Sequence, residues 1–474
     1  MTVQSHRKGI DMLNGSILSG IVRFAVPVAL SGLLQQLFNA ADTAVVGQFA
    51  PIGKLAVAAV SGNSFVINLM VSLFIGISVG ANVQMAACHG MNDREGMQRT
   101  LHTSLLFSLL CGIVLTIVGW FIAPTAHRLL STGTSVLADG TKTIDPVVLE
   151  QAIAYFRIYF LAMPFIMVYN FASAILRAKG DTRRPLIVLA ASGVLNVVLN
   201  VLFVKGLKMN ADGVAIATAL SNAFSCAALI WLLLHEDDAY RLHPKALRIH
   251  GRTLRQIVRI GLPAGIQNSM FAIANVILQS SINIYGNDVV AGTGIGIYCE
   301  YFGMNVVVGF SQAATSFTGQ NYAASKMDRC RKVARMSVIL GFLSTLIFSS
   351  LVILLREPFV SIFVDSSNPA NALVAETAMI RIIMVGLFQC FNGIGEIFSG
   401  CMRGMKRSLV PALISVGAIC GVRLLWILCF HQPEQGYEHL ITCFRLSWYA
   451  SAVCQTLAYL MVIRKEKSLR GIPS

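Results

Sequence analysis

The chain contains about a dozen apolar stretches of roughly 20 residues each, the length that a helix needs to cross a hydrocarbon core of roughly 30 Å. Strands of a membrane barrel would alternate apolar and polar residues, so continuously apolar stretches predict helices. We expect twelve membrane-spanning helices at residues 18–46, 56–86, 102–124, 150–176, 185–206, 211–234, 256–285, 292–318, 333–355, 374–401, 409–430 and 440–463.

Composition agrees with a membrane protein and excludes a soluble globular fold. Hydrophobic residues make up 55% of the 474 positions and charged residues 12%, against about 25% charged residues in soluble domains. The first residues are polar and carry no short apolar stretch before a cleavage site, so we expect no cleavable signal peptide. The eleven cysteines have no ligand spacing and are interpreted as small apolar residues, without a disulfide or zinc site.

The net charge of +15 is interpreted as a topology signal and not as nucleic-acid binding. Lysine and arginine gather in alternate connections, around residues 94–99, 177–184, 241–259, 326–335 and 403–407, and at both chain ends. The positive-inside rule makes these connections cytoplasmic. Both termini are then cytoplasmic, which requires an even number of spans and supports twelve.

An internal repeat divides the chain into two halves. Short matches recur in one order at offsets of 224 to 236 residues, pairing 21–27 with 257–263, 76–78 with 309–311, 155–158 with 379–382, and 176–185 with 402–411. The shift moves the first span onto the seventh, an even number of crossings, so the halves are parallel repeats. The fold class predicted is an all-α polytopic membrane protein with two parallel six-helix repeats.

The repeat also predicts the domain organisation, with a substrate cavity between two lobes. The expected parts are an N-terminal tail (1–17), an N-terminal six-helix lobe (18–234), a basic linker (235–255), a C-terminal six-helix lobe (256–463) and a basic C-terminal tail (464–474).

Asp42 is the leading candidate for a functional group inside the membrane. An ionisable residue at the centre of a span costs roughly 2.5–3.5 kcal/mol on insertion scales and therefore asks for an explanation. Asp42 shares one helix face with Gln35 and Asn39, at spacings of i, i+4 and i+7. Desolvation favours the protonated form of such a carboxyl group, which suits a proton carrier.

Further polar pairs follow in the fifth and sixth spans. Asn196 and Asn200 share a face at i, i+4, and so do Thr218 and Asn222. Together with Asp42 they predict a polar pocket inside the first lobe. The alternative is that these amides and hydroxyls only bond neighbouring helices together.

The second lobe differs in chemistry. Asn268, Asn275, Gln279 and Asn283 form an uncharged stripe along the seventh span, and Leu278 stands at the position that matches Asp42. Glu300 and Glu396 are expected either to face the cavity and attract cationic substrate or to pair with Arg381 or Arg403. Their replacement by glutamine should change substrate preference or have mild effects. Arg157 and Arg381 are expected to snorkel to the membrane surface.

Several segments resemble the multidrug and toxic compound extrusion (MATE) family of the MOP superfamily, most of all its bacterial branch with the DinF and MepA proteins. The resemblance rests on PVALSGLLQQLFNAADTAVVGQFAPIGKLAVAAV, on GISVGANVQMAACHGMNDREGMQR with its counterpart GFSQAATSFTGQNYAASKMDRCRK, on LRAKGDTRRP, and on GVAIATALSN. It implies an outward-open V of two lobes that exports varied, often cationic or amphiphilic compounds, driven by proton or sodium entry.

The resemblance also implies ion-coupling roles for Asp42, Asn196 and Thr218. Asn200 stands where the family often carries a second acid, and Phe271 where some branches carry a glutamate. A single carboxylate favours a proton over a weak sodium site at Asp42, Asn196 and Thr218. No other metal and no bound cofactor is expected.

The substrate cavity is expected to be lined by six polar residues: Gln35, Asn39, Asn268, Asn275, Gln279 and Glu300. The partners are small amphiphilic or cationic substrates and membrane lipid, and we expect a monomer in a bacterial cytoplasmic membrane. The alternative function is a flippase of lipid-linked saccharides, whose cavity should carry several cationic residues. An enzyme is disfavoured because no acid–base pair or metal cluster is recognisable.

Overall fold

The computed structural model describes residues 9–129, 134–136, 142–144, 146–236, 239–364 and 368–469. The first half consists of α1 (Ile17–Phe49), α2 (Lys54–Gly90), α3 (Arg94–Leu129), α4 (Pro146–Leu161), α5 (Met163–Lys179), α6 (Arg183–Asn200) with π-helical η1 (Val201–Gly206), and α7 (Ala211–Leu234). A small antiparallel hairpin of β1 (Thr134–Val136) and β2 (Lys142–Ile144) lies between α3 and α4.

The second half repeats this order after the short helix η2 (Pro244–Ala246). It consists of α8 (Gly251–Ile282) with η3 (Asn283–Tyr285), α9 (Asn287–Ala323), α10 (Met327–Leu354), α11 (Arg356–Ser361), η4 (Pro369–Asn371), α12 (Ala372–Gly386), α13 (Gln389–Gly404), α14 (Leu409–Ser415), η5 (Val416–Gly421), α15 (Val422–Leu425), η6 (Trp426–Phe430), η7 (Pro433–Gln435) and α16 (Gly436–Leu469).

The prediction of an all-helical fold with twelve spans in two repeats is confirmed. Ten described helices are long and apolar enough to cross a membrane, and α4 with α5, bent by 46°, makes an eleventh span. The twelfth is α9, with 37 residues, whose polar side chains lower its hydropathy.

Irregularities recur at matching places in the two halves. The break between α4 and α5 after Leu161 is matched by the break between α12 and α13 after Gly386. The fifth and eleventh spans both pass from α-helix into π-helix, at η1 and η5. Short π-helical stretches are rare and often occur at functional sites, so their repetition supports a duplicated architecture.

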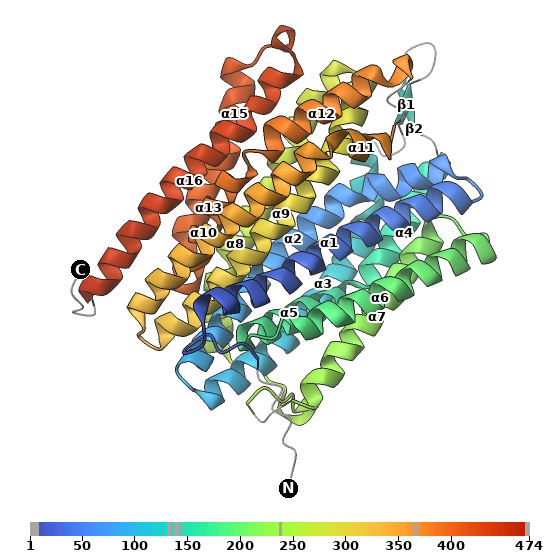
Figure 1. Cartoon of the computed structure of the whole chain (residues 1–474). Helices are drawn as coiled ribbons and strands as arrows, with labels where there is room; N and C mark the ends of the chain where they lie inside the picture. Colours follow the sequence, from blue (N-terminus) through green and yellow to red (C-terminus); the bar gives the residue numbers. More distant parts are fainter. Residues whose placement is uncertain are drawn as a thin grey trace.

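The connections that carry most of the basic residues lie at one end of the molecule, which we call the basic end. It holds the connections α2–α3, α5–α6, α7–α8, α9–α10 and α13–α14, and both chain ends point toward it (Figure 1). Within the described residues, hydrogen bonds between the lobes reach from this end as far as the bond from the Ser269 hydroxyl to the Leu69 carbonyl, 3.4 Å long.

Glycine allows the lobes to approach closely where α2 crosses α8. A Cβ atom on Gly76 would lie 2.2 Å from the Gly265 Cα atom, and one on Gly80 would lie 2.1 Å from the Ile257 carbonyl oxygen. Small residues replace the missing hydrophobic driving force between membrane helices with close van der Waals contact. These glycines therefore position the two lobes.

Helix α1 packs into the cores of both lobes. Its first half contributes Ile21 and Phe24 to a cluster formed with second-lobe residues, and its second half contributes Val45 and Val46 to a first-lobe cluster. Gly193 on α6 leaves room for the ring of Phe38 on α1. Asp42 therefore lies on the half of α1 that belongs to the first lobe.

An ion cluster fastens the connection after α7 to the turn between α5 and α6. The Glu236 carboxylate accepts hydrogen bonds from Lys179 and Arg184, and its side chain is 6% exposed. Burial alone would raise the pKa of Glu236, but the bonds and charges of the two cations outweigh it and leave the pKa below its ordinary value. The Glu236 carboxylate is therefore ion-paired, and it holds the connection after α7 against the turn between α5 and α6 at the basic end.

Candidate functional site

The predicted ion-coupling residues lie together inside the first lobe. The amide nitrogen of Asn200, on the last residue of α6, donates to Asp42 Oδ1 at 2.5 Å and to the Asn196 side-chain oxygen at 3.3 Å. The Asn196 amide donates in turn to the Thr218 hydroxyl at 3.3 Å. Asn200 is fully buried. A chain of polar groups therefore leads from α7 through α6 to the carboxylate on α1.

One acceptor in this pocket has no partner. The Asn200 side-chain oxygen is buried, and among the described residues it receives no hydrogen bond. The structure also describes no arginine or lysine in an ion pair with Asp42. A buried orphan acceptor beside a carboxylate without a counter-charge fits a bound proton or a small cation.

Two tyrosines on α4, which sequence reasoning missed, lie close to the pocket: Tyr155 is buried and Tyr159 is partly buried. Tyr155 and Tyr159 stack with ring centroids 6.0 Å apart and interact electrostatically with Asp42. Nothing in the apolar sequence around them distinguishes these rings from ordinary core residues.

Gln35 and Asn39 share the helix with Asp42 but do not join its hydrogen-bond network. Both side chains are exposed, and in the described part of the chain neither has a hydrogen-bond partner. Their spacing placed them correctly on α1. The structure leaves them outside the pocket and open on the helix surface.

Glu300 forms a buried ion pair with Arg381 in the second lobe. The Arg381 Nη2 atom lies 2.7 Å from Glu300 Oε2, and the Arg381 residue is only 3% exposed. Gln389 donates to the Glu300 main-chain oxygen at 2.8 Å. The expectation that Arg381 snorkels to the surface is therefore wrong, because its charge is neutralised inside the lobe.

Arg423 is a functional candidate that sequence reasoning missed. It is 7% exposed, donates to the Ser447 hydroxyl at 3.2 Å and to the Asn275 side chain at 3.3 Å, and lies 4.1 Å from the centre of the Phe444 ring. Arg381 lies on the same ring, at 4.9 Å. A lone arginine within the apolar run from 409 to 430 was the signal that could have revealed it.

The polar stripe predicted along α8 does not form one network. Asn268 donates to the Ser72 main-chain oxygen of the first lobe at 3.4 Å, Asn275 accepts from Arg423, and Gln279 donates to Asn283 at 3.0 Å. Each amide has its own partner. The stripe thus serves the lobe contact, the arginine and the helix end separately.

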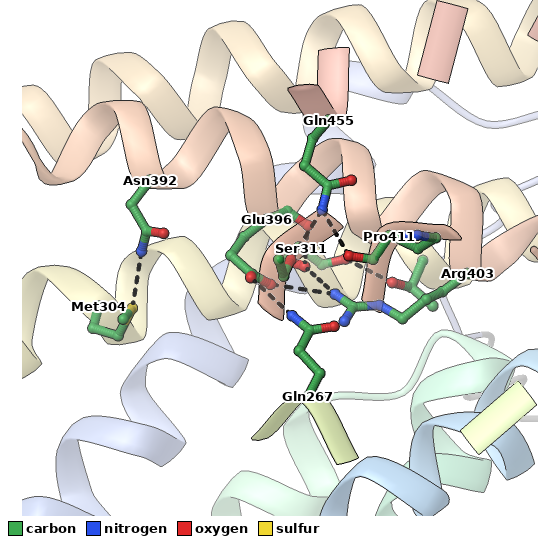
Figure 2. Close-up of polar contacts among 10 residues, drawn as sticks. Gln267, Met304, Ser311, Asn392, Glu396, Arg403, Pro411 and Gln455 are labelled. Carbon is green, nitrogen blue, oxygen red and sulfur yellow. Dashed lines mark hydrogen bonds and ion pairs between the residues drawn. The ribbon is translucent and has the colours of Figure 1, made fainter. Parts of the chain in front are cut away.

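Glu396 lies in a second polar cluster nearer the basic end (Figure 2). Its carboxylate accepts hydrogen bonds from the Gln267 amide at 3.3 Å and from the Arg403 guanidinium at 3.4 Å, and its main-chain oxygen accepts one from the Ser311 hydroxyl at 2.8 Å. Of the two readings left open for Glu396, the structure contains the pair with Arg403. In the part of the chain that the structure describes, no cluster of three metal-binding side chains is present.

Two six-helix lobes in parallel, with a partly buried carboxylate in the first lobe and a partly buried ion pair in the second, define a polytopic membrane protein of the two-lobe transporter fold. The chain belongs to the MATE family, because the MatE family model matches residues 27–202 and 263–427, well over half of its length. Members of this family are transporters and not enzymes.

Similar proteins cover nearly the whole chain. The probable multidrug resistance protein YoeA of Bacillus subtilis is 27% identical over 420 residues, which cover 86% of each chain. The multidrug export protein MepA of Staphylococcus saprophyticus is 21% identical and covers 94% of each chain. An outward-facing structure of a multidrug resistance MATE family transporter has a TM-score of 0.85 at 22% identity and covers 97% of this chain and 99% of its own.

Proposed function

We propose that this chain is a secondary active antiporter that exports cationic or amphiphilic compounds from a bacterial cell in exchange for protons, with sodium as the alternative ion. The single observation that carries the proposal is the lone carboxylate of Asp42, bonded to Asn200 without a counter-charge. The names of the relatives YoeA and MepA, a multidrug resistance and a multidrug export protein, support drugs as substrates.

The Asn200 side chain suits both protonation states of Asp42. An ionised carboxylate accepts from the amide nitrogen, which is the bond described at 2.5 Å. A protonated carboxyl group is a donor and can be served by the amide oxygen once the amide turns, since an amide carries both a donor and an acceptor. Proton binding then changes the hydrogen bonds between α1 and α6. The proton can therefore stabilise one conformation of the transporter over the other.

Sodium would be held less well in the same pocket. Its ligands would be one carboxylate of Asp42 and the neutral oxygens of Asn196, Asn200 and Thr218, whereas a proton needs only the carboxylate. We therefore propose that the proton gradient drives export.

The test is dye export by purified protein in proteoliposomes with an imposed proton or sodium gradient, one at a time. Wild type and Asp212→Asn should respond to the proton gradient, and Asp42→Asn should not. Asp212 is a matched control because it lies in the first turn of α7 and accepts from the Asn210 main-chain nitrogen at 2.9 Å, away from the pocket. Sodium-driven export without a proton gradient would refute proton coupling.

The substrate cavity is proposed between the lobes, where Gln35, Asn39, Asn268, Asn275, Gln279 and Glu300 were predicted to line it. Exposure of Gln35, Asn39 and Asn275 supports this location. Glu300 is already paired with Arg381, so it contributes less negative charge to the cavity than a free carboxylate would.

We also propose that the basic end is cytoplasmic, that both termini lie there, and that the protein acts as a monomer. A reporter fused after residue 245 or at the C-terminus should then be cytoplasmic. A reporter inserted near residue 138, a position outside the described residues, should be external.

A flippase of lipid-linked saccharides stays the second candidate, because Arg381 and Arg423 are cations inside the second lobe. Glu300 neutralises one of them, which leaves fewer charges than a pyrophosphate cavity would need. A fluorescent lipid-linked saccharide that changes leaflet only with active protein would favour this candidate.

A further inference from the structure

The Gly319–Gln320–Asn321 motif lies where α9 reaches the basic end, and its two amides bond to chain segments far away in sequence. Gln320 is 1% exposed and Asn321 fully buried. The Gln320 amide nitrogen donates to the Ala178 main-chain oxygen of the first lobe at 2.7 Å. The Asn321 amide nitrogen donates to the Met12 main-chain oxygen at 2.9 Å and to its own helix at Phe317. Both amides therefore bond to segments outside their own helix and lobe, Asn321 in addition to its bond within α9.

The segment 9–16, which precedes α1, contacts both lobes. The Ile10 main-chain nitrogen donates to the Gly180 oxygen in the turn between α5 and α6, at 3.2 Å. The Met12 side chain, 1% exposed, packs into the second-lobe cluster with Phe317 and Met327. This segment therefore joins the two lobes at the basic end.

Two cations after α9 hold the same segment through its main chain. The Arg329 Nε atom donates to the Met12 oxygen at 3.2 Å, and Arg329 Nη2 donates to the Gly15 oxygen. Lys326 donates to the Leu13 oxygen at 3.2 Å and to the Asn14 side chain at 2.8 Å. The contacts use main-chain oxygens, so they fix the path of the segment more than its sequence.

The lobes are closed around the motif. A Cβ atom on Gly90 would lie 2.2 Å from the Gln320 main-chain oxygen. The Ser316 hydroxyl, one turn before Gln320, bonds to the Asn82 side chain of the first lobe at 3.1 Å, and Ser316 is 1% exposed. A compound cannot pass between the lobes at this level while these contacts persist.

We propose that Gln320, Asn321 and the segment 9–16 form the lock that holds the lobes together at the basic end, and that the lock must open in each transport cycle. The proposal rests on the proposed function as an exporter, since only alternating access requires the lobes to part here. Each bond contributes a modest net free energy, so the lock is reversible. The segment continues directly into α1, which places the lock on the same helix as Asp42.

The experiment measures access to a buried cysteine, without substrate or ion gradient. Ser316→Cys is placed in a background without other cysteines, in lipid nanodiscs that leave both ends free, and its rate of labelling by a polar maleimide is measured. Gln320→Ala and Asn321→Ala should each raise the rate on the order of fivefold, the factor expected when one hydrogen bond that crosses to the facing segment is lost.

Two controls separate opening of the lock from general loosening. Gln455→Ala removes an amide that is equally buried but bonds only within the second lobe, to Pro411 and Ser415 at 2.8 and 2.9 Å (Figure 2). This change should leave the labelling of Ser316→Cys as it was. A second reporter, Ser399→Cys, at a fully buried position of α13, should stay protected in all variants.

Faster labelling of Ser316→Cys alone supports the lock. Unchanged labelling in both motif variants overturns it, and so does labelling of Ser399→Cys that rises in parallel. Because labelling needs no transport, a failure of drug export combined with the expected labelling would refute the proposed function and leave the lock intact.

Discussion

Replacement of Glu300 by glutamine should lower the temperature at which the second lobe unfolds, whereas the sequence suggested a changed substrate preference or a mild effect. Glu300→Gln removes the negative charge that lies 2.7 Å from Arg381 Nη2, while the arginine side chain stays 4% exposed. The Nε and Nη1 atoms of Arg381 have no hydrogen-bond partner among the described residues. The guanidinium would then be a buried cation without a counter-charge, left with the Phe444 ring at 4.9 Å.

The expected loss follows from the burial of the pair. Removing one partner of a buried ion pair costs about 3–5 kcal/mol, and the second cation, Arg423, on the same Phe444 ring adds repulsion. For a unit of about 200 residues each kcal/mol lowers the melting temperature by roughly 2–4 °C, so a decrease of roughly 6 °C or more is expected.

The assay is the melting temperature of detergent-solubilised protein followed by fluorescence-detected gel filtration. Glu357→Gln is the matched control, because this glutamate is 71% exposed and 3.8 Å from Arg356, and it should melt within about 1 °C of wild type. The double variant Glu300→Gln/Arg381→Gln should recover most of the stability. A single Glu300→Gln variant as stable as wild type would refute the reasoning.

Three further outcomes are expected. Asp42→Asn should insert and fold like wild type but lose gradient-driven export, measured as drug resistance at matched expression; normal resistance would mean that the proton is carried elsewhere. Gly76→Ala should destabilise the solubilised protein by about 1–3 kcal/mol because the new Cβ would lie 2.2 Å from Gly265 Cα, whereas Gly294→Ala, with no neighbour within 4 Å, should not. The stabilisation from Glu236, whose pKa is lowered from 4.5, should be fully present above about pH 4.5 and lost as the pH falls through the lowered value; melting curves against pH should therefore change less in Glu236→Gln.

The fold could be predicted because its strongest signal is local. Runs of apolar residues determine where a helix can cross a membrane, and the structure has helices at all twelve predicted spans. The break after Leu161 lies beside Pro164, where the sequence predicts a kink because proline removes a backbone hydrogen bond. The break after Gly386 was not predicted, because it has no such residue and apolar periodicity does not encode a bend. Where a span breaks thus depends on local residues and on packing, and not on the apolar stretch as a whole.

The candidate site was predictable only where residues stand at helical spacing. Asn196 and Asn200 were correctly grouped with Asp42, since spacing and a missing counter-charge can be read along a chain. Arg381 and Arg423 could not be grouped, because the ring that both contact, Phe444, comes from another span. Pairings of single charges across helices need the three-dimensional structure.

The crossed packing of the two lobes carries information about the origin of the chain. Gly76 on α2 lies against Gly265 on α8. In the same way Gly309 on α9 lies against Ala29 on α1, because a Cβ atom on Gly309 would lie 3.3 Å from the Ala29 methyl group. Gly309 and Ala29 are the repeat counterparts of Gly76 and Gly265, so one contact occurs twice, with the roles of the halves exchanged. This is the geometry of an isologous dimer of two six-helix chains. After fusion each copy could change alone, so one half could acquire the carboxylate and the other the arginines.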